Sequence, residues 1–494
     1  MNKLYDIVFK TQENRKLLYF KGNADITEQG LCIAAGDAVD FLTYFNSFSV
    51  SKWKEYTNIK KLQINGNIVG YAEIEINTIG KNGKLLTKQQ VSGDFSVCLN
   101  VENISGEILG IKVKANNNTI IQKITYLGEF TEWKQQKIGI VICTYKREKY
   151  VKATIDKLVK FSKKNIWLTT LVVDNGSTLK ECENDYLRII HNPNYGGSGG
   201  FTRGIIENLK SKTNDYVLLM DDDIDLDTTV LERTHSLVSA LKDEYRESFV
   251  AGAMLNMDDP YIQYENTAYW NRIKLIGLGK NINLSQNASL INNNNNIKNY
   301  TNQYAAWWYC CIPVNRIEMI GLPLPFFIKG DDIEYSIRND RKIIFINSIA
   351  VWHEPFTKKT EMWINYFSDR NMLILNFYAA DCNALTFLIS VIGRLVKRCI
   401  SNNYSSINIL YYAINDVYNG FEKITEFGAD KKLRDVQDLA RKHSNIKQIF
   451  GILWILFIIT IHYKKYRDKY IYFRNYMNNK SFWENYYIKA NRLE

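Results

Sequence analysis

The residue pattern with the clearest chemical meaning is a run of three aspartates, Asp221 to Asp223, that directly follows the apolar run VLLM. Clustered carboxylates repel one another unless a cation lies among them or water screens them. Because alternate residues at the end of a strand point to one side, Asp221 and Asp223 are placed to share a divalent cation with a diphosphate. Hard cations such as Mg²⁺ and Mn²⁺ prefer oxygen ligands of this kind. The alternative interpretation is a solvated acidic turn that caps a helix.

A second acidic pair, Asp331 and Asp332, follows Gly330 at the start of a predicted helix. The spacing of Glu334 and Arg338, four residues apart, supports that helix. A carboxylate at a helix N-terminus is stabilised as the anion, which suits a general base that must be ionised at neutral pH. An ordinary N-cap aspartate is the alternative.

Aromatic residues accompany the other candidate groups. His353 follows a strand-like apolar run and lies next to Trp352. A lone histidine beside aromatic residues is either a satisfied core residue or, with an acidic triplet in the same domain, a metal ligand. The pair Trp307 and Trp308 fits core packing or stacking on a sugar, and from the sequence alone we assign both to the core.

Two further predicted strands end in polar turns, and a glycine-rich segment follows. The first strand ends in Thr144–Arg147, which carries two cations, and the second in Asp174–Ser177, a carboxylate followed by a tight turn. The segment Asn192–Gly204 precedes a predicted helix over 201–209. Its glycines allow either a close approach of the backbone to an anion or simply a flexible loop. No Walker sequence GK[ST] is present there.

The spacing of apolar residues changes along the chain and predicts three regions. Residues 1–136 alternate at period two between turn signals, which predicts a β-sandwich. Residues 137–360 contain continuous apolar runs separated by helical stretches such as 148–162. This pattern predicts a parallel, doubly wound α/β sheet with ligands at the carboxyl ends of its strands. Residues 361–494 have helical periodicity, and the asparagine run 292–296 is predicted to be a surface loop.

Composition and charge exclude several classes of protein. The chain has 494 residues, 46% of them apolar, and only six prolines, which excludes a disordered or fibrous protein. Nearly half of its net charge of +11 lies in the last 33 residues, where eight Lys and Arg face three Asp and Glu. A local basic tail favours an anionic surface as a partner, and no nucleic-acid recognition motif is present. Scattered cysteines and an N-terminus without a signal-peptide pattern predict a cytoplasmic protein with reduced thiols.

The apolar run 449–461 is shorter than the roughly 20 residues that span a bilayer. A basic, tyrosine-rich segment follows it, and together they predict a peripheral anchor on the anionic inner face of the cell membrane. The alternative is a buried helix followed by a solvated basic tail.

Taken in order, these motifs resemble those of the family 2, GT-A type glycosyltransferases, and within them the bacterial galactofuranosyltransferases. The resemblance rests on the segments IGIVICTYKRE, VVDNGS, NYGGSGGFTRG, LLMDDDI, WWYCCIP, FIKGDDIEYSIR and VWHE. It extends upstream to Thr43–Thr57 and downstream to Tyr366–Asn371. It implies a Rossmann-like GT-A domain, of the nucleotide-diphospho-sugar transferase kind, between an N-terminal β-sandwich and a mainly helical C-terminal region.

The resemblance also implies an activity and a set of roles. The enzyme would transfer galactofuranose from UDP-galactofuranose to a saccharide hydroxyl with inversion, with Asp332 as the general base. The ligands of Mn²⁺ or Mg²⁺ would be Asp221, Asp223 and His353. The donor-binding residues would be Thr144, Arg147, Asp174, Asn194, Gly196, Gly197, Asp222 and Glu265. The acceptor-binding residues would be Trp307, Trp308 and Asp331.

The sequence leaves other functions open. A family 2 transferase that uses UDP-galactopyranose, UDP-glucose or dTDP-rhamnose is the first alternative, because no residue fixes the sugar or its ring size. The second is a non-catalytic carbohydrate-binding protein, which the acidic clusters disfavour. We further expect a lipid-linked saccharide acceptor in the synthesis of a surface polysaccharide such as a capsule or O-antigen, a membrane surface as a partner, and a homo-oligomer.

Overall fold

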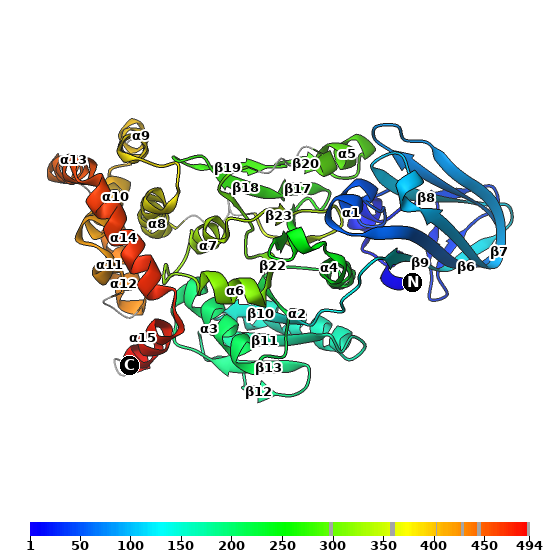
Figure 1. Cartoon of the computed structure of the whole chain (residues 1–494), viewed down its shortest axis with the longest axis horizontal. Helices are drawn as coiled ribbons and strands as arrows, with labels where there is room; N and C mark the ends of the chain where they lie inside the picture. The colour runs from blue at the N-terminus through cyan, green and yellow to red at the C-terminus, as the bar shows by residue number, and fades with distance from the viewer. Residues whose placement is uncertain (296–299, 356–360, 402, 426–428, 442–445, 492–494) are drawn as a thin grey trace.

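The computed structural model describes residues 1–295, 300–355, 361–401, 403–425, 429–441 and 446–491. Figure 1 shows an elongated molecule with three parts in a row: an N-terminal sheet in blue, a central α/β part mainly in green, and a C-terminal group of helices in yellow to red. The order of the three parts follows the predicted regions. Where one domain ends and the next begins remains a prediction.

Hydrogen bonds join the strands of the N-terminal part into one antiparallel sheet. The strands are β1 (Asn2–Asp6), β2 (Lys21–Gly22), β3 (Asp25–Ile26), β4 (Leu31–Ile33), β5 (Ala38–Asp40), β6 (Ile59–Ile79), β7 (Leu85–Asn100), β8 (Ile108–Ala115) and β9 (Thr119–Phe130). Strand β6 pairs with β9 along its first half and with β8 along its second half. The partner changes around Gly70, whose φ of +111° suits glycine. Strand β6 therefore links two groups of strands, β9 with β1, β4 and β3 along one half and β8 with β5 and β2 along the other.

The central part contains an eight-stranded sheet in the order β12-β13-β11-β10-β14-β22-β15-β23. Its strands are β10 (Ile138–Thr144), β11 (Leu168–Asp174), β12 (Cys182–Glu183), β13 (Leu187–His191), β14 (Tyr216–Asp221), β15 (Phe249–Ala251), β22 (Tyr309–Pro313) and β23 (Ile343–Ile344). Strands β13, β11, β10 and β14 run parallel as predicted, whereas β22 is antiparallel to both neighbours, so the sheet is mixed. The parallel register brings Thr144 opposite Asp174 and places Asp221 at the same edge.

Two small sheets and several helices complete the central part. The strands are β16 (Ala253–Asn256), β17 (Ile262–Glu265), β18 (Thr267–Trp270), β19 (Leu275–Leu278), β20 (Ile282–Asn283), β21 (Gln303–Tyr304) and β24 (Ala350–His353). The helices are α2 (Glu148–Ser162), α3 (Gly196–Ser211), α4 (Thr229–Ala240), α5 (Asn287–Asn295), α6 (Val314–Ile320) and α7 (Asp331–Asn339), and α1 (Val50–Tyr56) belongs to the N-terminal part.

The prediction of a surface loop at the asparagine run was wrong for residues 292–295, which belong to helix α5. Asn293 and Asn294 are buried there. The amide of Asn293 exchanges hydrogen bonds of 2.9 and 3.0 Å with Gln263 and donates one of 2.9 Å to Asn347. Tertiary hydrogen bonds thus offset the low helix propensity of asparagine, and residue 296 lies outside the described residues.

The C-terminal part consists of packed helices. They are α8 (Ile364–Tyr378), α9 (Ala384–Ile400), α10 (Tyr404–Asn419), α11 (Phe421–Thr425), α12 (Ala429–Ala440), α13 (Ile446–Ile461), α14 (Tyr463–Met477) and α15 (Lys480–Asn491). Among the described residues, no single helix has the length and hydropathy of a membrane span. Helices α13 and α14 meet that test together as a pair bent by 85°.

The glycine-rich segment is the start of helix α3, so the prediction of a helix over 201–209 was too short and the flexible loop is excluded. A Cβ at Gly200 would lie 2.1 Å from Cys143 Sγ, and one at Gly204 would lie 2.2 Å from the Val141 side chain. These two glycines therefore let α3 approach strand β10 closely. At Gly197 an added Cβ would meet no atom within 4 Å. Of Gly197, Gly200 and Gly204, only Gly197 therefore faces open space.

We expect Gly204→Ala to lower the free energy of unfolding by about 1–3 kcal/mol, because overpacking forces α3 away from Val141. Urea unfolding followed by circular dichroism measures this change. Gly393→Ala is the matched control, since an added Cβ there meets no atom within 4 Å and alanine favours a helix by about 0.5–1 kcal/mol. Equal destabilisation by both substitutions would contradict the close approach as the reason for Gly204.

Candidate functional site

Asp221, Asp223 and His353 form a group that could hold a metal ion. Their ligand atoms all lie within 4.8 Å of one another. His353 Nε2 is 3.0 Å from Asp223 Oδ1 and 3.7 Å from Asp221 Oδ2. The Nδ1 atom lies 2.6 Å from the carbonyl oxygen of Glu354, which only accepts, so Nδ1 carries a proton and Nε2 faces the carboxylates. Two carboxylates and one imidazole oriented in this way fit a divalent cation.

Electrostatics around the group also favour a cation. Burial lowers the pKa of His353, but the hydrogen bond to Asp223 and the charges of both aspartates outweigh burial and raise the pKa above its usual value. The imidazole therefore attracts a proton between these two carboxylates. A divalent cation would replace that positive charge at the same place.

A pair of backbone hydrogen bonds brings the two metal-binding segments together. The amide of Asp225 donates to the carbonyl of Trp352 at 2.9 Å, and the amide of Trp352 donates to the carbonyl of Asp225 at 2.9 Å. This bridge lies two residues after Asp223 and one residue before His353. It joins the loop after β14 to strand β24 and so sets the spacing of the ligands.

The backbone of Asp225 forms this bridge, and its side chain makes salt bridges with two cations. Arg15 Nη1 lies 2.7 Å from Asp225 Oδ2, and Lys157 Nζ lies 2.5 Å from Oδ1. The guanidinium of Arg15 also lies 3.9 Å from the ring centroid of Trp352. Because Arg15 belongs to the N-terminal part, the metal-binding group is supported from outside the central sheet. Arg15 was not predicted as a site residue, because it lies 210 residues before Asp225 and no motif connects the two.

Asp222 points toward β10. It accepts hydrogen bonds from Thr144 Oγ1 at 2.7 Å and from Arg147 Nη1 at 3.3 Å, while Arg147 Nη1 is 2.5 Å from Asp223 Oδ2. Burial raises the pKa of Asp222 to about 6, although Thr144 and Arg147 act in the opposite direction. Thr144 and Arg147, both predicted to bind the donor, are therefore at the acidic triplet and contact carboxylates there.

The other predicted donor-binding residues differ in what they contact. Asp174 is fully buried, and its oxygens accept backbone hydrogen bonds from Gly176, Thr178 and Leu179, so it holds the turn after β11. Asn194 Oδ1 accepts a hydrogen bond of 3.1 Å from the amide of Gly196.

Glu265, the last of the predicted donor contacts, lies at the end of β17. It is buried, and it contacts the hydroxyl of Tyr304 at 3.3 Å and Lys280 Nζ at 3.5 Å. Burial raises the pKa of Glu265, although Lys280 and Tyr304 act in the opposite direction. The charges of both Glu265 and Asp332 reach Tyr304 and, with its burial, raise the pKa of that hydroxyl.

The start of helix α3 and the start of helix α7 meet at one hydrogen bond. Ser198 Oγ donates to Asp331 Oδ2 at 2.7 Å, and the amide of Ser198 donates to the carbonyl of Phe327 at 3.1 Å. Gly196 has no room for a side chain, since a Cβ would lie 2.2 Å from Phe327 O. Ser198 and Asp331 are 133 residues apart in sequence, so this hydrogen bond brings the glycine-rich segment and the Asp331–Asp332 pair together.

Asp332 is less buried than Asp331 and accepts a hydrogen bond of 2.8 Å from the amide of Ile333. Burial and the charge of Asp331 raise its pKa well above the usual value, and the charge of Asp221 adds to this effect. The helix N-terminus, expected to keep Asp332 ionised, is therefore outweighed. A raised pKa makes this carboxylate a stronger base once it is deprotonated.

The segment before Asp331 has an unusual backbone that helix α8 holds in place. Phe327, Lys329 and Gly330 all have positive φ angles, of 71°, 64° and 86°. The side-chain amide of Asn371 donates to the carbonyls of Phe326, Ile328 and Lys329 at 3.2, 2.9 and 2.6 Å, and Arg370 Nη2 donates to that of Phe326 at 2.8 Å. We call Arg370 and Asn371 the α8 clamp. Both residues lie in the segment Tyr366–Asn371 that carries part of the resemblance, but no role was predicted for them.

Both tryptophans are buried, as the sequence alone predicted. Trp308 Nε1 donates to the carbonyl of Gly252 at 2.8 Å. Trp307 packs edge-on against Phe201 of α3 and Tyr335 of α7, and its Nε1 has no hydrogen-bond partner among the described residues. Trp307 therefore joins the two helices that carry the candidate site.

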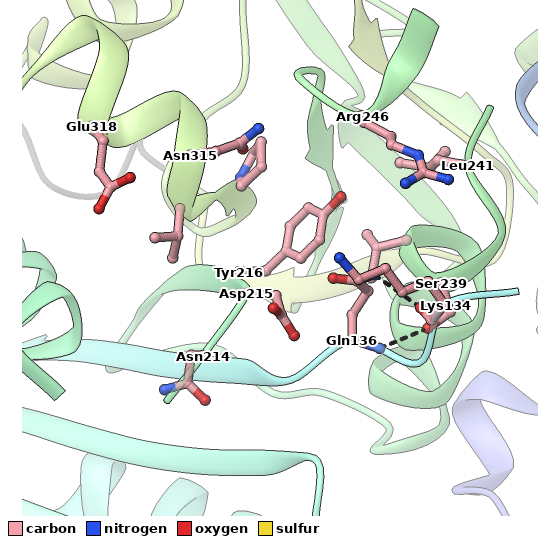
Figure 2. A pocket seen from close by; sticks show the side chains of 13 residues that line it. Lys134, Gln136, Asn214, Asp215, Tyr216, Ser239, Leu241, Arg246, Asn315 and Glu318 are labelled. Atoms are coloured by element: carbon pink, nitrogen blue, oxygen red, sulfur yellow. Dashed lines mark hydrogen bonds between the residues drawn. The ribbon is translucent and has the colours of Figure 1, made fainter. Parts of the chain in front are cut away.

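A cavity of about 330 Å³ lies at the other end of the sheet (Figure 2). Its lining includes Gln136, Asn214 and Asp215, which precede strands β10 and β14, whereas the acidic triplet follows β14. The cavity is therefore separate from the candidate site.

Two family profiles match the chain. Residues 9–128 match the family described as Galactofuranosyltransferase 2 N-terminal, and residues 139–301 match Glycosyl transferase family 2. The second match includes Asp221, Asp223 and Glu265 and ends before Asp332 and His353.

Individual relatives extend over more of the chain. Galactofuranosyltransferase GlfT2 of Mycolicibacterium smegmatis is 23% identical over 462 residues, which are 84% of this chain and 69% of the relative. GlfT2 of Mycobacterium tuberculosis is 24% identical over 438 residues, 81% of this chain and 68% of the relative. Among solved structures, residues 1–349 of Staphylococcus aureus TarS in complex with UDP align with a TM-score of 0.36 at 15% identity, covering 65% of this chain and 90% of that one.

We expect Asp223→Asn to weaken Mn²⁺ binding at least about tenfold, because it removes a charged ligand from the group. Titration calorimetry with the metal alone measures the affinity. Asp227→Asn is the control, since Asp227 accepts hydrogen bonds from Thr229 at the start of α4. Unchanged Mn²⁺ affinity in Asp223→Asn would show that the group does not bind the metal.

We expect Asn371→Ala to loosen the segment before Asp331, because three carbonyls lose their shared donor. Hydrogen–deuterium exchange should become at least about tenfold faster in peptides covering 326–332, which corresponds to roughly 1.4 kcal/mol of local stability. Asn376→Ala is the matched control, because Asn376 is equally buried on α8 but its side-chain amide bonds within that helix. Equal exchange in both variants would contradict the clamp.

Proposed function

We infer that this chain, which belongs to the family 2 glycosyltransferases and has their GT-A fold, is a galactofuranosyltransferase that transfers galactofuranose from UDP-galactofuranose to a saccharide hydroxyl. The observation that carries this proposal is a combination within one chain. An N-terminal part that matches galactofuranosyltransferases precedes a sheet whose carboxyl edge carries Asp221 and Asp223, with His353 of the neighbouring sheet and the start of α7 beside them.

The donor diphosphate would bind at the acidic triplet. Asp221, Asp223 and His353 would hold Mn²⁺ or Mg²⁺ there, and a bound ion would neutralise the charge that develops on the leaving diphosphate. Arg147 is already among these carboxylates and would turn to a phosphate oxygen once the cation replaces it. The open face at Gly197, at the N-terminus of α3, would receive another part of the donor.

Asp332 would act as the general base. Its carboxylate would take the proton from the acceptor hydroxyl as that oxygen attacks the anomeric carbon and the bond to the UDP oxygen breaks. One base without a carboxylate nucleophile on the other side of the sugar fits direct displacement with inversion. Ser198 and the α8 clamp would position the base through Asp331 and the backbone before it.

The acceptor site is proposed at Asp331, Trp307 and Trp308. Trp307 lies between α3 and α7, and its buried N–H has no partner among the described residues, which an acceptor oxygen would supply. We retain UDP-galactopyranose, UDP-glucose and dTDP-rhamnose as donors to be tested, because nothing at Glu265 or the triplet fixes the ring size.

The first experiment measures UDP release by the full chain with Mn²⁺ or Mg²⁺. UDP-galactofuranose is compared with the other donors, with and without galactose-terminated lipid acceptors, and with EDTA. Release from the furanose donor alone supports the proposal. Release only from another donor would keep the fold and mechanism but overturn the sugar.

We expect Asp332→Asn to lower turnover by about 10²- to 10⁴-fold while UDP binding stays within about twofold, because the substitution removes only the base. UDP release and titration calorimetry measure the two quantities. Asp340→Asn, at the other end of α7 and exposed, is the control and should retain activity. Loss of UDP binding together with turnover would refute this role for Asp332.

A further inference from the structure

Helices α9 and α13 each leave one apolar face uncovered. On α9 the exposed apolar residues are Leu385, Ile389, Ile392, Val396 and Ile400. On α13 they are Phe450, Leu453, Trp454, Phe457 and Ile461. Their spacing of three or four residues places each set on one side of its helix. Phe450 and Trp454 are each 64% exposed, although large aromatic residues usually lie inside a folded protein.

The two faces belong to neighbouring helices. Helices α9 and α13 contact each other, and both pack on α10. Their uncovered sides therefore point away from the same supporting helix. Figure 1 shows α9 and α13 at the end of the molecule opposite the N-terminal sheet. We call these ten residues the α9–α13 face. Exposed apolar residues gathered on neighbouring helices mark an interaction site.

Cations border the α9–α13 face. Neither helix contains an acidic residue. Lys397 is exposed on the last turn of α9, and Lys464 and Lys465 are exposed on the first turn of α14, directly after α13. An apolar surface with a cationic border is complementary to a bilayer whose headgroups are anionic.

We propose that the α9–α13 face binds the surface of an anionic membrane, with its aromatic residues in the headgroup region. The sequence predicted a peripheral anchor made of the apolar run 449–461 and the basic segment after it. This assignment differs in adding α9, and in that the segment after α13 is packed against the protein. Tyr463, Tyr470 and Met477 of α14 are buried. In α15, Trp483 Nε1 donates to the carbonyl of Pro323, and the hydroxyl of Tyr487 donates to that of Gly199 in α3.

The proposal deepens the proposed function, since it states where a lipid-linked acceptor would reach the enzyme. Helix α8 contacts α9, α10, α14 and α7, and it carries the α8 clamp. Helices α9 and α8 would therefore lie between the membrane surface and the segment before Asp332. Membrane binding does not require catalysis, so the two ideas are tested separately.

The test is flotation of the full chain with vesicles of phosphatidylcholine containing phosphatidylglycerol, compared with phosphatidylcholine alone. The wild type should float with the anionic vesicles. The triple variant Phe450→Ser, Trp454→Ser, Phe457→Ser should reduce the bound fraction at least tenfold. The matched triple variant Val69→Ser, Tyr71→Ser, Leu85→Ser removes similarly exposed residues from the N-terminal sheet and should float like the wild type.

A second pair of variants tests the charge. Lys464→Glu with Lys465→Glu should weaken binding to anionic vesicles, whereas Lys163→Glu with Lys164→Glu, an exposed pair after α2, should not. UDP release with a soluble acceptor should be unchanged in all four variants, so that loss of flotation is distinguished from loss of activity.

Three results would overturn the proposal. The first is a wild type that does not float with anionic vesicles. The second is an equal loss of flotation in the test and matched variants. The third is a wild type that is dimeric in solution, does not float, and becomes monomeric in the Phe450, Trp454 and Phe457 variant, which would assign the α9–α13 face to a second copy of this chain.

Discussion

The repulsion among the carboxylates at the end of β14 is the constraint on which the candidate site depends. Asp221, Asp222 and Asp223 lie together at the edge of a buried sheet, where like charges are costly. Neighbouring groups offset the charges of two of these aspartates. Thr144 and Arg147 donate hydrogen bonds to Asp222, and His353 Nε2 lies beside Asp223. Asp221 remains the most exposed of the three, with 34% of its side chain accessible. The compensation is therefore incomplete at Asp221, whose pKa is raised by burial, and this carboxylate gives the metal-binding group one open side.

The second acidic group is built by distant parts of the chain. Asp331 depends on Ser198 of α3, and the backbone before it depends on Asn371 of α8. Helix α15 in turn contacts α3 through Tyr487 and the carbonyl of Gly199. The positive φ angles between Phe327 and Gly330 persist because these contacts hold the segment, a common arrangement where backbone strain serves a site. The geometry near Asp332 thus depends on the central and C-terminal parts together.

The sequence predicted this site well where chemistry coincides with the end of a strand. The resemblance implied that Asp221, Asp223 and His353 meet, and their ligand atoms do lie together. Asp221 ends a strand of the eight-stranded sheet, as expected for a ligand site. His353 ends β24 of a separate four-stranded sheet, and the Asp225–Trp352 bridge brings it beside the triplet. The role of α3 glycines was harder to predict, since a glycine that accommodates Val141 has the same sequence signal as one that accommodates a phosphate. The prediction of a loop at the asparagine run, where the structure has helix α5, was wrong for a related reason. The hydrogen bonds that stabilise this helix come from Gln263 and Asn347, which lie far away in sequence.

The salt bridge from Arg15 to Asp225 limits how such chains recombine. Arg15 lies in the N-terminal part, yet it supports the bridge at Trp352 that fixes His353. A chimera that joined the central part to a foreign N-terminal sheet would retain every metal ligand and still lose this guanidinium. Gene fusion or exchange within the family is therefore constrained at a position outside the catalytic part. Functional chimeras should be those whose foreign sheet supplies a cation at the place of Arg15.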